Sequence, residues 1–305
     1  MGCELRDQFP VARAVFQEAD DALGFSLSKL CFDGPEEELR LTEHTQPAIL
    51  TVSVAALRVL EERGVTCEFA AGHSLGEYSA HVAAGTLSFT DAVRTVRNRG
   101  RYMQEAVPAG VGAMAAILGM KAESVSEACA DAARESGGVV APANMNAPEQ
   151  TVISGATAAV ELAAAKCKEH GAKRAVMLKV SAPFHCALMQ PAQDRLASDL
   201  RGTTFHDPNV RVVSNIDASW VATGDAARDA LVRQVTGAVR WVECEQQLLA
   251  SGVTHCIEVG PGKVLCGLMR SLNSDRTGDS SRTCLNVENV ATLDKTLAAL
   301  GESIC

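Results

Sequence analysis

Hydrophobic positions in the first hundred residues repeat at helical spacing, apart from one short apolar run. Helical spacing predicts amphipathic helices, and a short apolar run between turn residues predicts a buried strand. Four elements are therefore expected in this order: helix 48–63, strand 67–71, helix 76–84 and helix 90–106. Pro47 in the first turn and Gly64 after the last residue fit the usual asymmetry of helix ends, and Thr90 is expected to cap the third helix.

The pattern changes between residues 112 and 180, where apolar runs and helical segments alternate. Six elements are expected there: strand 113–118, helix 121–136, strand 139–146, strand 150–154, helix 156–170 and strand 174–180. This order is the β-α-β-β-α-β unit of ferredoxin-like folds. We therefore expect a ferredoxin-like small subdomain at 112–180, inserted into a core made of 1–111 and 181–305.

Helices and strands alternate again after residue 181. Residues 211–214 and 255–259 are expected strands, and the polar stretch 273–282 is expected to be a loop. Such alternation indicates an α/β protein with a mainly parallel sheet covered by helices.

Composition narrows the possible functions. The chain of 305 residues is 47% apolar and carries a formal charge of −9, which argues against nucleic acid as a partner. No signal-peptide core and no apolar run of membrane-spanning length is present. Eleven cysteines without a C-x-x-C pair predict reduced thiols in a cytoplasmic setting, with neither a disulfide framework nor a metal site.

Residues 72–76 read Gly-His-Ser-Leu-Gly, the G-x-S-x-G pattern of a nucleophile elbow. The predicted strand before the motif and the predicted helix after it are the context that this motif needs. Ser74 is therefore the candidate nucleophile, and the N–H of Leu75 at the amino end of the helix is the candidate oxyanion donor. The alternative is an ordinary strand-to-helix turn.

A serine nucleophile needs a base, and the chain has seven histidines. His185 follows an apolar strand and the pair Pro183-Phe184, at the return from the small subdomain. Its position makes it the best candidate, against the alternative of a histidine in a structured turn. No acid after Ser74 is singled out, so a Ser–His dyad oriented by a backbone carbonyl suits the sequence as well as a triad.

Several further segments, taken with the elbow, resemble one family over nearly the whole chain. They are Thr45-Gln46-Pro47-Ala48, Gly72-His73-Ser74-Leu75-Gly76-Glu77-Tyr78, Arg99-Gly100-Arg101-Tyr102-Met103-Gln104, Gly112-Ala113-Met114-Ala115-Ala116, Ala182-Pro183-Phe184-His185-Cys186 and Glu258-Val259-Gly260-Pro261-Gly262. In this order they are similar to the malonyl-CoA:acyl carrier protein transacylases. The resemblance implies an α/β hydrolase-like acyltransferase core and a cytoplasmic [acyl-carrier-protein] S-malonyltransferase of fatty acid synthesis.

The resemblance also implies a role for each candidate residue. Ser74 is acylated by malonyl-CoA with His185 as base, and the backbone carbonyl of Gln234 orients the imidazole. Arg99 binds the free carboxylate of the malonyl group, and Phe184 crowds branched acyl groups. The malonyl group then passes to the phosphopantetheine thiol of an acyl carrier protein, and no cofactor beyond these substrates is implied.

Two of these implications are weaker when the residues are considered alone. Without the resemblance, Arg99 is not distinguished from the neighbouring arginines at 94, 97 and 101. Carrier proteins are usually acidic and so is this chain, so docking needs a local basic patch. The candidates for it are Arg101, Lys173, Arg174, Lys263 and Arg270.

The chain departs from the family at its beginning. The family starts with a strand and a G-Q-G-S-Q turn whose glutamine helps form the oxyanion hole, whereas Met1-Gly2 resembles the Met-Gly that follows that turn. Three explanations are open: a start codon assigned too late, a fragment, and an impaired or non-catalytic form that only binds its ligands. Two further alternatives are a discrete acyltransferase of a polyketide synthase and a serine hydrolase.

Overall fold

The computed structural model describes residues 1–108, 110–274 and 282–303. The chain divides into two compact units. The first consists of Met1–Arg97, His206–Val212 and Leu248–Cys305, and the second of Asn98–Phe205 and Val213–Gln247. Helices combine with parallel strand pairs in the first unit and with an antiparallel sheet in the second, so the predicted α/β class is confirmed.

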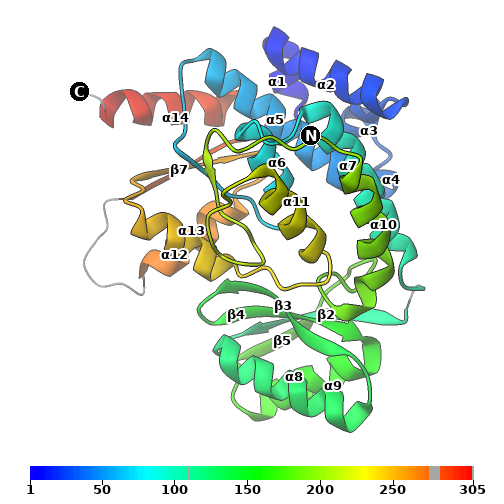
Figure 1. The fold of residues 1–305 in the computed structure, drawn as a ribbon. Helices are drawn as coiled ribbons and strands as arrows, with labels where there is room; N and C mark the ends of the chain where they lie inside the picture. Colours follow the sequence, from blue (N-terminus) through cyan, green and yellow to red (C-terminus); the bar gives the residue numbers. More distant parts are fainter. Residues whose placement is uncertain (109, 275–281, 304–305) are drawn as a thin grey trace. The chain divides into compact units, whose positions relative to one another are not determined.

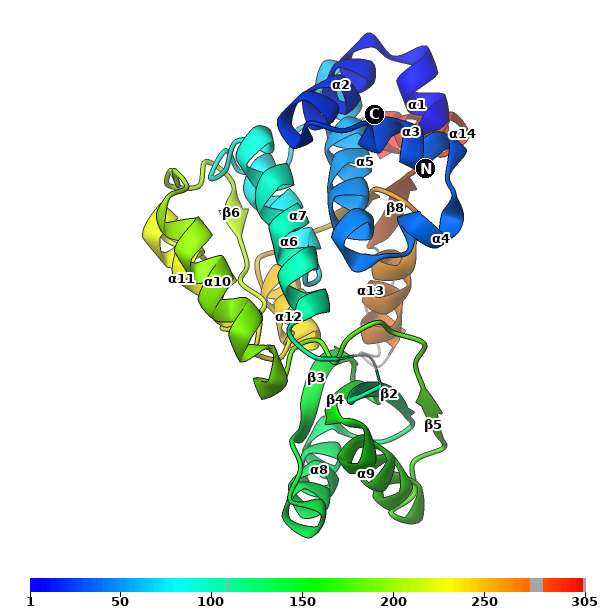
Figure 2. The ribbon, with the colours of Figure 1, turned by 90° about the vertical axis from the view of Figure 1, so that its right-hand side faces the viewer.

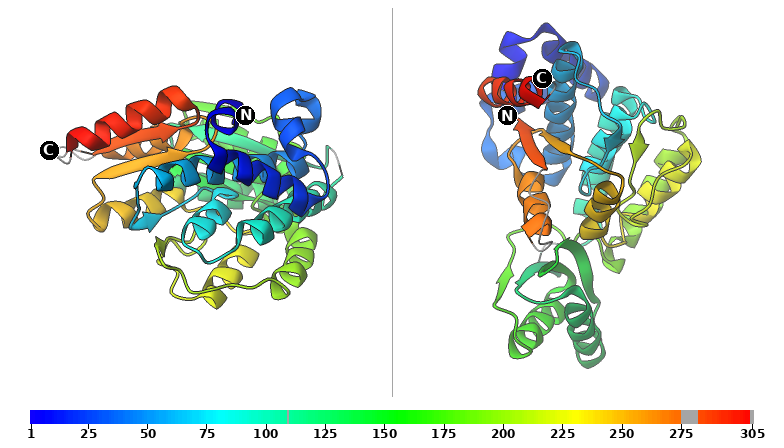
Figure 3. Two further views of the ribbon diagram at one scale, coloured as in Figure 1. Left: turned by 90° about the horizontal axis from the view of Figure 1, so that it is seen from above. Right: turned by 90° about the vertical axis from the view of Figure 1, so that its left-hand side faces the viewer.

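The first unit carries its strands as parallel pairs, β1 with β6 and β7 with β8. Helices α13 and α14 flank the β7–β8 pair (Figures 1 and 3). The elements of this unit are α1 (Cys3–Gln8), α2 (Pro10–Leu23), α3 (Leu27–Asp33), α4 (Glu36–Leu39), α5 (Thr42–Glu62), β1 (Phe69–Ala70), α6 (Gly76–Ala83), β6 (Arg211–Val212), β7 (His255–Val259), α13 (Val264–Ser274), β8 (Thr283–Val287) and α14 (Val290–Ser303). The parallel pairing matches the expectation from the alternating pattern.

Helix α5 begins earlier than its sequence pattern predicted. It starts at Thr42, so Pro47 lies inside the helix and not in its first turn. The proline removes one backbone donor but lies near enough to the amino end for α5 to continue. Burial of Thr42, Gln46 and Pro47 explains the extension, because these side chains pack in the core.

The elements around the elbow are mostly as predicted. Helix α6 ends at Ala83 and Gly85 follows in the left-handed region, with φ of 70°. Strand β1 is shorter than the expected 67–71 and only half-buried, because Cys67 and Glu68 are exposed. Helix α7 (Phe89–Glu105) is capped by Ser88 and not by Thr90, since the Ser88 Oγ accepts the N–H of Asp91 at 3.0 Å.

The second unit contains the ferredoxin-like sheet, in the strand order β3-β4-β2-β5 with antiparallel neighbours. Helices α8 and α9 cover one face of this sheet (Figures 1 and 2) and bury a core of alanine, valine, isoleucine and cysteine side chains against it. The elements are β2 (Gly112–Leu118), α8 (Ala122–Ser136), β3 (Val140–Ala147), β4 (Gln150–Ala156), α9 (Thr157–Glu169), β5 (Arg174–Met177), η1 (Ala187–Met189), α10 (Gln190–Arg201) and α11 (Gly224–Arg233). Helix α12 (Trp241–Ala250) belongs to the second unit up to Gln247 and to the first unit from Leu248.

Two further elements differ in length from the sequence prediction. Strand β5 ends at Met177, three residues short of the predicted end, and it is an edge strand that β2 alone pairs. Helix α13 extends through Ser274 into the predicted polar loop, and residues 275–281 of that loop lie outside the described residues. The boundaries of an inserted subdomain at 112–180 and a core of 1–111 and 181–305 stay a prediction.

In the part of the chain that the structure describes, no helix has the length and apolar character to cross a membrane. Within the same residues, no group of three or more His, Cys, Asp or Glu side chains is arranged to hold a metal ion.

Candidate active site

Ser74 occupies the turn between β1 and α6 in a strained backbone conformation. Its φ is 53°, in the left-handed region that non-glycine residues avoid. Three non-glycine residues of the described ranges have positive φ, and they are Ser74, His185 and Ala218. The turn is held by the hydrogen bond from the N–H of Glu77 to the Ser74 carbonyl, at 3.1 Å. Such strain costs about 1–3 kcal/mol and concentrates at functional sites, which favours the nucleophile over an ordinary turn.

The two glycines of the elbow have different roles. A Cβ on Gly72 would overlap the carbonyl group of Gly76 and lie 2.6 Å from the backbone nitrogen of Glu77. A Cβ on Gly76 would meet nothing within 4 Å. Gly72 therefore allows the close approach of the two backbone segments. Neither Gly72 nor Gly76 has a positive φ, and the left-handed residue of this turn is Ser74.

Leu75 lies at the amino end of α6, where backbone N–H groups have no partner within the helix. No described residue accepts a hydrogen bond from its N–H, whereas its carbonyl accepts the N–H of Tyr78 at 3.0 Å. The positive end of the α6 dipole is at the same place. This geometry lets the Leu75 N–H stabilise an oxyanion formed at Ser74.

His185 lies in the second unit and is nearly fully buried, with 3% of its surface exposed. Its φ is 59°, and its Nδ1 lies 2.9 Å from the carbonyl oxygen of Gln234 and 3.2 Å from that of Gly237. Carbonyl oxygens only accept hydrogen bonds, so Nδ1 carries the proton and Nε2 is the basic nitrogen. No carboxylate is needed to fix this tautomer.

The carbonyl groups around His185 come from the carboxyl end of α11 and from the turn that follows it, which contains Gly237. Gln234 is the residue at the end of this helix, and its own N–H bonds to the carbonyl of Ala230. The last carbonyls of a helix carry partial negative charge, which favours a protonated imidazole beside them. The second acceptor, Gly237, was missed at the sequence level because a backbone carbonyl gives no residue-specific signal.

Arg99 and Phe184 also lie in the second unit. Arg99 on α7 is 2% exposed, and its Nη2 donates to the Gln234 Oε1 at 2.9 Å. Phe184 is half-buried and packs against the apolar cluster of Met114, Ala143 and Val152. The structure thus brings Arg99, Gln234 and His185 into one hydrogen-bonded chain, while Phe184 has a clear packing role.

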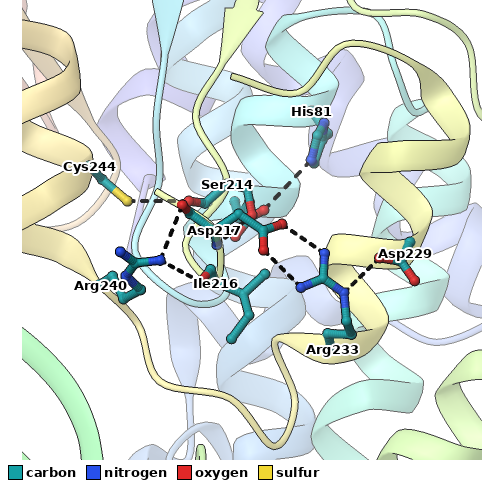
Figure 4. Close-up of polar contacts among 9 residues, drawn as sticks. His81, Ser214, Ile216, Asp217, Asp229, Arg233, Arg240 and Cys244 are labelled. Carbon is teal, nitrogen blue, oxygen red and sulfur yellow. Dashed lines mark hydrogen bonds and ion pairs between the residues drawn. The ribbon is translucent and has the colours of Figure 1, made fainter. Parts of the chain in front are cut away.

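A charged cluster supports the segment that carries the Gln234 and Gly237 carbonyls (Figure 4). Arg233 donates to both carboxylate oxygens of Asp217, at 2.9 and 2.7 Å, and to Asp229 at 2.6 Å. These hydrogen bonds from Arg233 hold the pKa of Asp217 below its usual range. The bidentate pair fixes the end of α11 against the turn that contains Asp217.

The predicted basic patch is divided between the two units. Lys173 and Arg174 are neighbours at β5, and Arg101 lies on α7, all in the second unit. Lys263 and Arg270 belong to the first unit. A single docking patch made of all five stays a prediction.

His81 on α6 is a buried histidine that the candidate mechanism does not use. It is 0% exposed, neither ring nitrogen has a hydrogen-bond partner among the described residues, and the Glu77 Oε1 lies 4.0 Å from its Nε2. Burial lowers the pKa of His81 from 6.5 to about 4. The folded chain therefore keeps His81 neutral at pH values where the unfolded chain protonates it.

We expect His81→Leu to make the protein more resistant to acid. Between pH 6.5 and about 4 the unfolded wild-type chain binds a proton that the folded chain does not, so unfolding becomes easier as pH falls. Over this pH window the pKa shift of His81 lowers the free energy of unfolding by roughly 3 kcal/mol. Urea unfolding at several pH values measures it, with the exposed His170→Leu as control; equal pH dependence in His81→Leu and wild type would contradict the assignment.

Comparison with known proteins identifies the class and then the family. Residues 1–291 match the acyl transferase domain family, so this fold with its serine elbow defines an acyltransferase. The malonyl CoA-acyl carrier protein transacylase of Escherichia coli K12 is 51% identical over 273 residues, covering 89% of this chain and 88% of that protein. The chain belongs to the malonyl CoA-acyl carrier protein transacylase family.

Two solved structures support the same assignment. An acyl carrier protein S-malonyltransferase from Vibrio cholerae matches with a TM-score of 0.92 and 46% identity, covering 97% of this chain and 94% of that chain. A malonyl transacylase in complex with a type II polyketide synthase acyl carrier protein also matches with a TM-score of 0.92, at 45% identity, covering 98% of this chain and 94% of that chain. The hydrolase-like core and ferredoxin-like subdomain predicted from the sequence are thereby confirmed.

Proposed function

We propose that the chain transfers a malonyl group from malonyl-CoA to the phosphopantetheine thiol of an acyl carrier protein, in the cytoplasm and in the service of fatty acid synthesis. The observation that carries the proposal is the strained Ser74 on its elbow, in a chain that belongs to a transacylase family. The reaction is ping-pong, with a malonyl ester of Ser74 as the intermediate.

In the first half-reaction, His185 removes the hydroxyl proton as Ser74 attacks the thioester carbonyl of malonyl-CoA. The Leu75 N–H and the amino end of α6 stabilise the resulting oxyanion. Collapse of the tetrahedral intermediate breaks the C–S bond, and the leaving thiolate of coenzyme A takes the proton from His185. Ser74 is then malonylated and His185 is neutral again.

The carboxyl end of α11 takes the place of a triad acid. His185 becomes positively charged while it holds the serine proton, and the carbonyls of Gln234 and Gly237 accept its Nδ1 proton. The partial negative charge at the end of α11, which Gln234 caps, stabilises this imidazolium, and Gly237 adds a second acceptor. A dyad oriented by backbone carbonyls is therefore our choice between the two arrangements that the sequence left open.

Acyl-group selectivity is assigned to Arg99. A buried guanidinium can hold a carboxylate by two parallel hydrogen bonds, and an acetyl group leaves those donors without their partner. Phe184 contributes bulk against branched groups. No cofactor takes part, because the substrates carry every group that is transferred.

In the second half-reaction, His185 accepts the proton of the carrier's phosphopantetheine thiol. The thiolate attacks the malonyl ester, the oxyanion forms again beside Leu75, and the Ser74 oxygen leaves with the proton from His185. The carrier thioester is released and the enzyme returns to its starting state.

The test is a transfer assay with malonyl-CoA and a phosphopantetheinylated carrier protein. We expect wild type to form malonyl carrier faster than it forms free malonate, and Ser74→Ala to form none above background. Free malonate as the main wild-type product would favour a hydrolase. Tight binding of malonyl-CoA without any transfer would favour the non-catalytic form.

A polyketide carrier is a second candidate acceptor. The solved complex with a type II polyketide synthase carrier, at 45% identity to this chain, gives the specific reason. Parallel kcat/KM measurements with a fatty acid carrier and a polyketide carrier separate the two. A preference of tenfold or more for the polyketide carrier would move the assignment to that pathway.

A further inference from the structure

Gln234 makes two different contacts through two different groups. Its backbone carbonyl accepts the Nδ1 proton of His185 at 2.9 Å, and its side-chain Oε1 accepts a hydrogen bond from the Arg99 Nη2, also at 2.9 Å. The residue is fully buried, with 0% of its surface exposed, so water does not compete for either contact. The side chain can therefore be changed without removing the carbonyl that orients the base.

The Arg99 guanidinium is buried and is held by a residue that is distant in the sequence. The guanidinium is 2% exposed and sits on α7, while its acceptor comes from the end of α11, far along the chain. A long arginine side chain has many rotamers, and a hydrogen bond to a buried amide restricts them. The amide is neutral, so this contact fixes the guanidinium without cancelling its positive charge.

We propose that the Gln234 side chain is a positioning residue for acyl-group selectivity, because it holds Arg99 through a neutral acceptor and leaves the guanidinium charge for the substrate carboxylate. This inference rests on the proposed function of Arg99. Gln234 then has two roles: its backbone carbonyl orients the base, and its side chain holds the arginine that selects the acyl group.

Two substitutions separate charge from positioning. Gln234→Glu gives Arg99 a carboxylate at nearly the same place, which competes with the malonyl carboxylate for the guanidinium and repels it. Gln234→Leu removes the acceptor and leaves a buried donor without that hydrogen bond. Both variants keep the backbone carbonyl that faces His185.

The experiment measures rates of Ser74 acylation by malonyl-CoA and by acetyl-CoA, read by intact-protein mass. We expect the malonyl-to-acetyl ratio to fall roughly 100-fold in Gln234→Glu and about tenfold in Gln234→Leu, from the usual cost of losing a hydrogen bond to a charged group. Arg99→Ala gives the reference loss of selectivity. Gln193→Glu is the matched control. Gln193 lies on α10 and its Oε1 accepts a hydrogen bond from the Thr236 hydroxyl at 2.6 Å, so the substitution adds the same charge away from Arg99. This variant should keep the wild-type ratio.

A second measurement separates the inference from the proposed function. In a Ser74→Ala background, titration calorimetry compares the affinities for malonyl-CoA and acetyl-CoA with and without Gln234→Glu. If malonyl-CoA does not acylate Ser74 in the wild-type chain, that result contradicts the proposed function. The ratio of the two affinities measured by calorimetry would still test the role of Gln234. A folded Gln234→Glu variant with unchanged malonyl preference, or with both substrates weakened equally, would overturn the inference.

Discussion

Gly72→Ala is expected to destabilise the chain by about 3 kcal/mol and to abolish acyl transfer. The added methyl group would overlap the carbonyl of Gly76 and crowd the backbone nitrogen of Glu77 at 2.6 Å. Both neighbours are main-chain atoms of α6, which cannot move aside as a flexible side chain can. Relief of the clash has to shift the first turn of α6, and with it the N–H of Leu75.

Gly76→Ala is the control for this prediction. Its Cβ would meet nothing within 4 Å, and alanine is the better helix former, so stability should change by less than about 1 kcal/mol. Urea unfolding and the malonyl transfer rate measured on both variants give the comparison. Equal stability of Gly72→Ala and Gly76→Ala would show that the elbow does not have the described close approach.

His185→Ala is expected to slow acylation of Ser74 by about 10²–10⁴ while the protein remains folded. The substitution removes the base and leaves the carbonyls of Gln234 and Gly237 without their donor. The second effect predicts a stability loss of about 1–3 kcal/mol, which can be measured separately. Added imidazole should restore part of the rate, because a small base can diffuse to the vacant position.

The exposed His170→Ala serves as control and should act like wild type in rate and in stability. A His185→Ala variant that acylates at the wild-type rate would remove His185 from the mechanism. A slow variant that imidazole does not rescue would point to a structural role for the buried ring.

Much of the fold could be predicted from the sequence, because periodicity and turn residues act locally. The alternating runs between residues 112 and 180 gave the ferredoxin-like order, and glycine at position 85 marked the end of α6. The start of α5 was placed too late, since proline in the first turn is only a preference and core packing extends the helix to Thr42. Ser88 replaced the predicted cap Thr90 because both hydroxyls fit the sequence rule and only one reaches the helix N–H.

The candidate site was predictable where a side chain carries the chemistry. The G-x-S-x-G pattern indicated Ser74, and the position of His185 after Phe184 indicated the base. Arg99 is not distinguished from nearby arginines by the sequence, because helical spacing alone does not show which arginine of α7 is buried. Its burial and its contact with Gln234 become visible in the structure.

Other parts of the site have no signature in the sequence. The second carbonyl at Gly237 and the side-chain contact of Gln234 depend on how the end of α11 meets His185 in three dimensions. The positive φ at His185 likewise has no motif that predicts it, unlike the positive φ at Ser74 in the elbow. Every residue has a backbone carbonyl, so the sequence does not show which carbonyl meets His185.

The most direct test of the central claim is the location of the acyl group after brief exposure of the wild-type chain to malonyl-CoA. Peptide mapping by mass spectrometry identifies the modified residue, with Ser74→Ala treated in parallel. We expect one malonyl group per chain, on Ser74, and none on the variant. A malonyl group on another residue, or equal labelling of Ser74→Ala, would contradict it.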